Sequence, residues 1–196
     1  NMKQRQCCDL SRDARTLILS QRAWNRQFYI PLVYEFEDLI ASVDTAHVLA
    51  PPFMHTGRMD GMLYRGGNFL RARYGRMTDP GIPNIELERD YDLFFCLLNF
   101  AYEVPSFRRL EKLRSRAKHA VCMFVEVWSS HADQYRRSLE LLNDLEFDHV
   151  FVNLSACLPA VRKVLRRPCS FLPLAVDALR FAPWPNPPAR NVRHQP

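Results

Sequence analysis

Four short apolar runs, separated by basic segments with a helical pattern, occupy residues 91–181 and constrain the fold more than any other feature of the chain. The two longest runs lack the alternation of polar and apolar side chains that marks a strand with one wet face, so they are typical of strands covered on both faces. Strands that alternate with helical segments form parallel α/β sheets. The four predicted strands are residues 91–100, 120–128, 149–153 and 169–176.

The segments between these runs are predicted to be amphipathic helices that cross from one strand to the next. In residues 105–118, Phe107, Leu110 and Leu113 recur at steps of three, and basic residues fill most of the other positions. Such crossovers are nearly always right-handed. The other two helices are predicted at residues 131–146 and 158–167.

The N-terminal part of the chain continues the same alternation. Residues 15–20 and 46–50 are predicted strands, and a helix is predicted between them at 31–43, where Pro31 suits the first turn. Glu35, Glu37 and Asp38 are expected on a solvated face near the start of that helix, where negative charge is favoured. The sequence therefore predicts an α/β fold with a Rossmann-like, doubly wound, mostly parallel sheet and helices on both faces.

Residues 53–90 fit this pattern less well. Residues 62–76 mix apolar and arginine residues with a Gly66-Gly67 pair, which predicts one broken amphipathic helix. It is expected either to be an ordinary surface helix or to lie on an anionic membrane surface. The glycine pair lacks the lysine and hydroxyl of a P-loop and the framing strand of a dinucleotide site, so no nucleotide-binding motif is predicted here.

Composition narrows the class of protein. The 196 residues, 47% of them hydrophobic, suit one domain with a sizeable core, and no apolar run reaches the roughly 18 residues of a membrane span. The polar start lacks the apolar centre of a secretory signal, and the six cysteines lack the spacing of a zinc site or disulfide framework. These features predict a cytoplasmic protein, either free or in peripheral contact with a membrane surface.

The net charge of +6 has two interpretations. The arginines are explained by solvated helix faces, or they indicate an anionic partner such as a phosphate-bearing substrate or an acidic membrane surface. A nucleic-acid partner is not predicted, because no basic stripe is interleaved with aromatic residues and no recognition motif is present.

Parallel sheets bind ligands at the carboxyl ends of their strands, so the residues that follow each apolar run are candidate site residues. Gln21 and Arg22 lie in the loop after the first strand. The others, after the central strands, are Asn99, Tyr102, Glu126, Trp128, His131, Asn153 and Asp177.

Several segments resemble the N-terminal domain of GT-B fold glycosyltransferases. The closing stretch Phe171-Leu-Pro-Leu-Ala-Val-Asp-Ala-Leu-Arg-Phe-Ala-Pro183 is similar to the motif that ends that domain, although Ala175 stands where the family usually has glycine. Residues 91–95, 124–128 and 147–152 resemble strand motifs of a bacterial branch of the retaining, family 4-like enzymes. The resemblance covers roughly residues 15–183.

The resemblance implies where the domains of the chain lie and which substrate each of them binds. Residues 1–14 are expected to be a loose leader, 15–182 the acceptor-binding domain, and 183–196 a proline-rich connector to a missing C-terminal domain. In the family that second domain binds the nucleotide sugar, so the chain is expected to be a fragment that is inactive, or nearly so, alone. These enzymes generally need no metal, and no cofactor is expected beyond the nucleotide-sugar co-substrate.

Roles for individual residues follow from the same resemblance. Glu126 is expected to accept a hydrogen bond from a sugar hydroxyl or to act as a base, or else to pair with an arginine. Trp128 is expected to stack on a sugar ring or to cap the core, and His131 to move a proton or to be a surface residue. Gln21 and Arg22 suit an acceptor phosphate or hydroxyl. Asn99 and Tyr102 are further acceptor-binding candidates, whereas Asp177 is expected to cap the turn into the connector.

Two functions are therefore open. The first is the acceptor-binding half of a nucleotide-sugar-dependent glycosyltransferase that transfers a hexosyl group to a glycan, lipid or small molecule. The alternative is a non-catalytic α/β module that binds a glycan or another subunit. A flavodoxin-like or receiver domain is disfavoured, because neither a phosphate-binding loop nor an acidic cluster beside a phosphorylatable aspartate is present.

Overall fold

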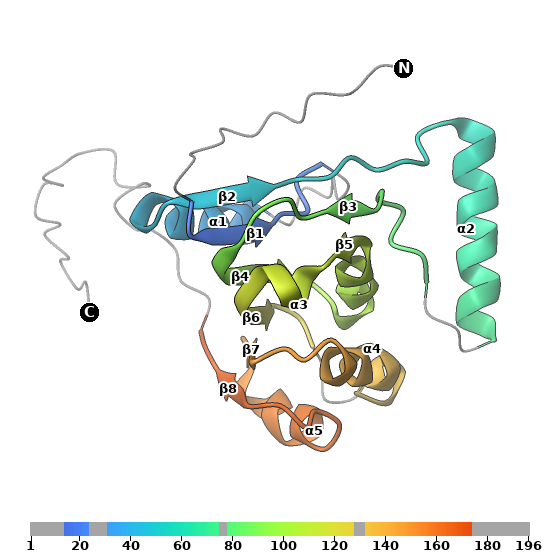
Figure 1. The fold of residues 1–196 in the computed structure, drawn as a ribbon. Coiled ribbons are helices and arrows are strands. Elements are labelled where there is room, and N and C mark those ends of the chain that lie inside the picture. The colour runs from blue at the N-terminus through green and yellow to red at the C-terminus, as the bar shows by residue number, and fades with distance from the viewer. Residues whose placement is uncertain (1–13, 24–30, 75–77, 128–131, 174–196) are drawn as a thin grey trace, which may run out of the picture.

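The computed structural model describes residues 14–23, 31–74, 78–127 and 132–173. Within these ranges strands and helices alternate along the chain (Figure 1). The predicted connector, and all but the last residue of the predicted leader, lie outside the described residues. In chain order the elements are β1 (Thr16–Leu19), α1 (Pro31–Val43), β2 (Ala46–Leu49), α2 (Arg58–Arg73), β3 (Ile85–Glu86), β4 (Tyr91–Leu98), η1 (Ala101–Arg109), β5 (Leu110–Glu111), α3 (Leu113–Arg116), β6 (Ala117–Phe124), α4 (Ala132–Asp144), β7 (His149–Val152), η3 (Ser155–Cys157), α5 (Leu158–Arg162) and β8 (Cys169–Phe171).

Six of the strands form one sheet in the order β2-β1-β4-β6-β7-β8, and every neighbouring pair is parallel. The predicted α/β class and Rossmann-like, doubly wound sheet are confirmed. The strand order reverses between β1 and β4, because the chain moves outward from β1 to β2 and then returns to the other side of β1. This reversal is the topological switch point of the sheet.

Alternate residues of the central strands face opposite sides of the sheet. Phe94, Cys96 and Leu98 of β4 belong to the larger hydrophobic cluster, which also includes side chains of η1, α4 and α5. Phe95 and Leu97 belong to a second cluster, which packs against α1. Both faces are therefore covered, and this explains why β4 is apolar at nearly every position.

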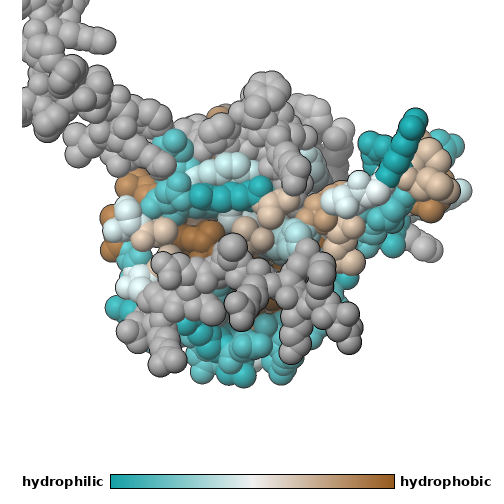
Figure 2. Space-filling view, turned by 90° about the horizontal axis from the view of Figure 1, so that it is seen from above, coloured by the Kyte–Doolittle hydropathy of each residue, from teal (hydrophilic) through white to brown (hydrophobic). Residues whose placement is uncertain are grey.

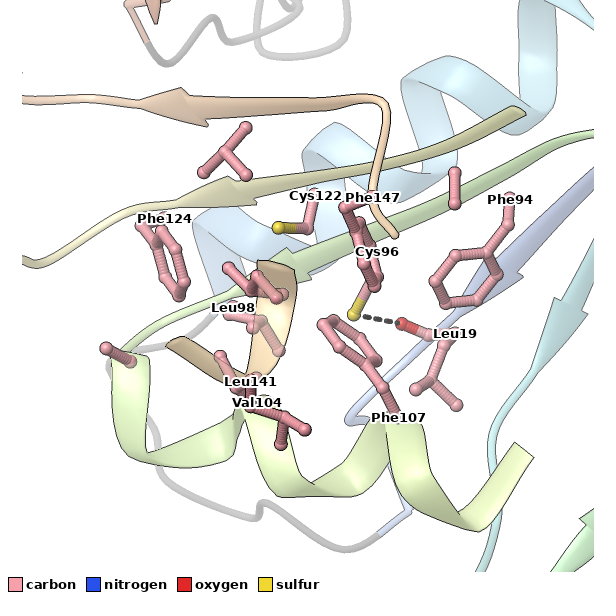
Figure 3. Packing of buried hydrophobic residues seen from close by; sticks show 14 of the residues in the cluster. Leu19, Phe94, Cys96, Leu98, Val104, Phe107, Cys122, Phe124, Leu141 and Phe147 are labelled. Atoms are coloured by element: carbon pink, nitrogen blue, oxygen red, sulfur yellow. Dashed lines mark hydrogen bonds between the residues drawn. The ribbon is translucent and has the colours of Figure 1, made fainter. Parts of the chain in front are cut away.

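Aromatic rings fill the centre of the larger cluster (Figure 3). The ring centroids of Phe94 and Phe107 are 5.7 Å apart with an edge-to-face geometry, and those of Phe107 and Phe147 are 4.8 Å apart. These three rings come from β4, η1 and the turn after α4, so they join the sheet to the helices that cover this face of it. Edge-to-face pairs of this kind add about 0.5–1.5 kcal/mol beyond the burial of their area.

The prediction of one α-helix at residues 105–118 is wrong. Residues 101–109 form the 3₁₀ helix η1, a short strand and a single α-helical turn follow, and β6 begins at Ala117. Phe107, Leu110 and Leu113 are all buried, as predicted, but they belong to three different elements, η1, β5 and α3, and not to one helix. Lys112, with a φ of 63°, then breaks the helical backbone.

Two other predicted boundaries also change. The helix after β7 ends at Arg162 rather than Arg167, and β8 ends at Phe171, before the end of the strand predicted at 169–176; residues 174–176 of that prediction lie outside the described residues. A second, two-stranded sheet, in which β3 pairs in parallel with β5, was not predicted. It ties the segment before β4 to the segment after η1.

Helix α2 is continuous through Gly66 and Gly67 and stands apart from the sheet (Figure 1). It follows β2 and lies on the side toward which the arrowheads of β1 and β2 point. No helix in the described part of the chain is both long enough and apolar enough to cross a bilayer.

Candidate functional site

The carboxyl ends of β1 and β4 meet at the switch point, where doubly wound sheets bind their ligands. Buried polar side chains gather there, although polar groups are otherwise scarce in the core of the described residues. We call this group the switch-point cluster. Its members are the buried Ser20, Gln21, Glu37, Asn99 and Glu103, together with the partly exposed Arg22.

Glu103 lies at the first turn of η1 and is almost fully buried. Its Oε2 atom accepts hydrogen bonds from Gln21 Nε2 at 2.7 Å, from the Asn99 backbone N–H at 2.8 Å and from the Phe100 backbone N–H at 3.1 Å. A glutamate three residues into a helix commonly reaches back to the N-terminal backbone in this way. One carboxylate thereby joins the end of β1 to the end of β4.

Glu37 lies on the inner side of α1 and is fully buried. Ser20 Oγ donates a hydrogen bond to its Oε2 atom at 2.5 Å, and Arg22 Nε donates to the same atom at 3.2 Å. The expectation that Glu37 lies on a solvated face is wrong. Glu37 follows the buried Val33 by four residues and so shares the side of α1 that faces the sheet.

Burial changes the acidity of both carboxyls. It raises the pKa of Glu37 to about 7, against the opposing effect of the Ser20 hydrogen bond and of Arg22. Burial likewise raises the pKa of Glu103 to about 7, against the hydrogen bonds from Gln21 and from the Phe100 and Asn99 backbones. A carboxyl with a pKa near 7 can hold or release a proton at neutral pH, which is the property of a general acid or base.

Arg22 connects the cluster to α1. Its Nη2 atom donates to Asp38 Oδ1 at 2.5 Å and to the Tyr34 carbonyl at 2.6 Å, and its guanidinium lies 5.3 Å from the centre of the Tyr34 ring. Arg22 therefore braces the loop after β1 against α1. Its predicted role as an acceptor-binding residue stays a prediction.

Two polar atoms of the cluster have no hydrogen-bond partner among the described residues. They are Asn99 Nδ2, a donor, and Glu37 Oε1, an acceptor, and both are buried. Most buried polar atoms in folded proteins are paired, so an unpaired donor and an unpaired acceptor make the switch point the candidate functional site among the described residues.

The structure brings Asn99 and Glu126 together, as the sequence predicted for residues at one edge of the sheet. The Glu126 backbone N–H donates to the Asn99 carbonyl at 2.8 Å, which extends the pairing of β4 with β6 past the end of both strands. Gln21 is completely buried beneath this edge, and Tyr102 is half exposed and stacked on Phe100 at 5.0 Å. Trp128, His131 and Asp177 lie outside the described residues.

Sequence reasoning missed Ser20, Glu37 and Glu103. For Glu103 a signal was present, because it stands at the position where a glutamate reaches back over a helix start. For Glu37 the signal was weaker. It interrupts the apolar stripe of Val33, Phe36 and Ile40 at helical spacing, and a charge within such a stripe indicates a buried partner.

The pockets in the described part of the chain lie elsewhere. One of about 550 Å³ is at the amino edge of the sheet, the opposite edge from the switch point. Most of its charged side chains form ion pairs: Arg15 with Asp92 at 2.8 Å, Arg116 with Asp90 at 2.8 Å and Arg114 with Asp148 at 3.1 Å. Another, of about 420 Å³, lies against the first turns of α2. The switch point is the stronger candidate site because its polar groups are mostly buried and incompletely paired, whereas most charged side chains of the amino-edge pocket are exposed to solvent and form ion pairs.

Comparison with protein-family models, with curated proteins and with solved structures finds no match to this chain.

Proposed function

We propose that this chain is the acceptor-binding half of a nucleotide-sugar-dependent glycosyltransferase. The observation that carries the proposal is the incompletely paired polar cluster at the carboxyl edge between β1 and β4, together with the domain-closing motif of residues 171–183. The donor is expected to be held by a second domain of the kind that the resemblance implies. A cytoplasmic location belongs to the same proposal and is supported by the buried Cys96, Cys122 and Cys169, which form no disulfide among the described residues.

In the proposed reaction the cluster binds an acceptor hydroxyl at the sheet edge. Asn99 Nδ2, which is buried in the free protein, donates a hydrogen bond to the sugar or phosphate oxygen next to that hydroxyl when the acceptor displaces the groups that cover it, and Glu126 accepts the hydroxyl proton. The acceptor oxygen then bonds to the anomeric carbon of the donor while the bond from that carbon to the nucleotide phosphate breaks, and the phosphate leaves with the negative charge. Glu103 and Gln21 hold Asn99 in place and do not touch the substrate.

The first test is acceptor binding followed by nuclear magnetic resonance of the ¹⁵N-labelled chain. Methyl glycosides of glucose, galactose and mannose are the probes, and the side-chain amide signals of Asn99 are observed. Asn143 is a matched internal control, because it is also buried but its Nδ2 atom already donates to the Val164 carbonyl. A shift at Asn99 with none at Asn143 supports the proposal. The absence of any shift at millimolar glycoside contradicts it.

The alternative, a non-catalytic glycan-binding or subunit-interaction module, is favoured by a different observation. Both buried carboxyls already accept hydrogen bonds within the protein, which suits a structural role as well as a chemical one. The protein isolated from its native source distinguishes the two functions. Transfer of labelled sugar from a nucleotide sugar, lost on Glu126→Gln, supports the transferase, whereas glycoside binding without transfer supports the module.

A further inference from the structure

Helix α2 presents its apolar side to solvent and its polar side to the protein. Its partly buried residues are Gly61, Tyr64 and Asn68, which recur at helical spacing on the inner side. The outer side carries Met59, Met62, Leu63, Phe69 and Leu70, whose exposed fractions lie between 52% and 76%. This arrangement is the reverse of an ordinary surface helix, in which the apolar side faces the core. Figure 2 shows hydrophobic atoms on the outer part of α2, next to hydrophilic ones.

Specific contacts hold the helix in this orientation. Tyr64 Oη donates to the Asp79 carbonyl at 2.5 Å, and the Asn68 side chain exchanges two hydrogen bonds with the Asp79 backbone at 2.9 and 2.8 Å. Arg71 adds an ion pair with the Asp79 carboxylate at 3.4 Å. Because these contacts occupy the polar side, the apolar side stays outward and is available to a partner.

The charges beside the apolar side are positive. Arg58 and Arg65 are seven residues apart and follow the same margin of the helix as Met62 and Phe69, which are four residues further along. Arg58, Arg65 and Arg73 are exposed, and none of them forms an ion pair within the described ranges. Asp60, the one acidic residue of α2, lies 3.0 Å from His55.

We propose that the outer side of α2, formed by Met59, Met62, Leu63, Phe69 and Leu70 with Arg58 and Arg65 at its margin, docks on an anionic lipid surface. An interfacial helix inserts its apolar side into the boundary of the acyl chains and leaves its basic residues at the lipid phosphates. A second copy of this chain is a poorer occupant, because two α2 helices in contact would bring their arginines together. The net charge of +6 favours the same partner. This inference does not depend on the transferase proposal.

The test is co-sedimentation of the full chain with vesicles. Vesicles of equal parts phosphatidylcholine and phosphatidylglycerol are expected to bind the protein, and vesicles of phosphatidylcholine alone are not. Leu63→Ser with Phe69→Ser is expected to weaken binding at least tenfold. Arg58→Gln with Arg65→Gln is expected to weaken it about thirty-fold at low salt, since each basic residue near an anionic surface contributes about fivefold.

Val43→Ser is the matched control, because Val43 is 77% exposed at the end of α1 and is expected to leave binding unchanged. All the substituted side chains are exposed, so circular dichroism is expected to show an unchanged fold. Equal binding by the wild type and the Leu63→Ser, Phe69→Ser variant would overturn the proposal, as would no binding to anionic vesicles. So would a dimer in light scattering that the same variant abolishes, because α2 would then bind a second copy.

Discussion

Two buried glutamates, Glu37 and Glu103, lie at the switch point, and the cost of burying their charge determines their pKa values. An ionised carboxylate is costly to bury unless hydrogen bonds or an opposite charge compensate it. Glu103 is compensated by three N–H donors, and Glu37 by the Ser20 hydroxyl and the Arg22 guanidinium. In both cases burial still dominates, so each pKa rises to about 7.

Replacing Glu103 tests its structural role. Glu103→Ala leaves the buried Gln21 amide and the Asn99 backbone N–H without their acceptor, and each lost acceptor costs about 1–3 kcal/mol. We therefore expect the free energy of unfolding to fall by about 3 kcal/mol, measured by urea denaturation. Glu103→Gln keeps one side-chain oxygen and is expected to cost less than half as much. Equal losses for the two variants would show that the acceptor oxygen is not what matters.

The raised pKa of Glu37 predicts a dependence of stability on pH. A carboxyl whose pKa is higher in the folded than in the unfolded protein binds its proton more tightly when folded, so its contribution to stability is present in full below about pH 4.5 and is lost as the pH rises through about 7. Over that range the loss is on the order of 3 kcal/mol.

Glu37→Gln cannot ionise, so the difference in unfolding free energy between the variant and the wild type is expected to move in favour of the variant as the pH rises. Urea denaturation at several pH values measures this difference. Taking the difference cancels the carboxyls that remain in both proteins. A difference that is constant with pH would mean that Glu37 does not titrate in this range.

At the scale of the elements, the turn before β3 fixes the position of α2, because Asp79 in this turn binds Tyr64, Asn68 and Arg71 of the helix. Asp79 lies at the centre of this turn, and its carboxylate accepts from the Gly81 backbone N–H at 2.9 Å and from Arg109 Nη2 at 2.9 Å. Gly81 has a φ of 72°, and a Cβ atom there would collide with the Phe53 ring. The turn therefore needs glycine for two separate reasons.

Gly81→Ala is expected to loosen the docking of α2. The strained backbone costs about 1–3 kcal/mol, and the collision with Phe53 disturbs the residues that pack against Tyr64. Hydrogen exchange is expected to quicken throughout α2, while the amides of β4 and β6 keep their rates.

Gly67→Ala is the control for this effect. No atom lies within 4 Å of the Cβ position at Gly67, and alanine in a helix interior is favoured over glycine by about 0.5–1 kcal/mol. Exchange in α2 is therefore expected to slow. Faster exchange in Gly67→Ala as well would contradict this prediction, because the effect of Gly81→Ala could then not be assigned to the turn.

At the scale of the whole molecule, the fold separates two surfaces that have different roles in the proposals. The switch-point cluster lies at the carboxyl edge of the sheet, and α2 stands on the side toward which β1 and β2 point (Figure 1). A protein docked through α2 would therefore have that edge of the sheet toward the membrane. This arrangement suits an acceptor that is carried on a lipid surface.

A hydrogen-exchange footprint of the whole chain on anionic vesicles tests this orientation. Protection is expected in α2, while α5 and β8, at the far end of the strand order from β2, keep their exchange rates. The Leu63→Ser, Phe69→Ser variant is expected to lose the protection of α2. Protection centred on α5 instead would place the docking surface on the opposite part of the molecule.

The sequence alone was sufficient to identify the class of the fold and the strands that build its centre. A strand buried on both faces must be apolar at almost every position. β4 and the second half of β6, from Ala120 to Phe124, have this composition, so both strands could be recognised without knowledge of any tertiary contact. The same logic placed Gln21, Asn99 and Glu126 at one edge, because residues that follow parallel strands share an edge. Local spacing was less decisive for residues 101–116, where steps of three residues suit both kinds of helix.

Only the tertiary structure decided which polar residues are buried and which apolar ones are exposed. Glu103 is bonded to Gln21, which is 82 positions away in the chain, and Glu37 to Ser20, 17 positions away, so the compensation of each charge depends on the order of the strands. The outward apolar side of α2 likewise depends on a turn that binds its polar side. Periodicity shows that a helix has two sides, whereas long-range contacts determine which of them meets the protein.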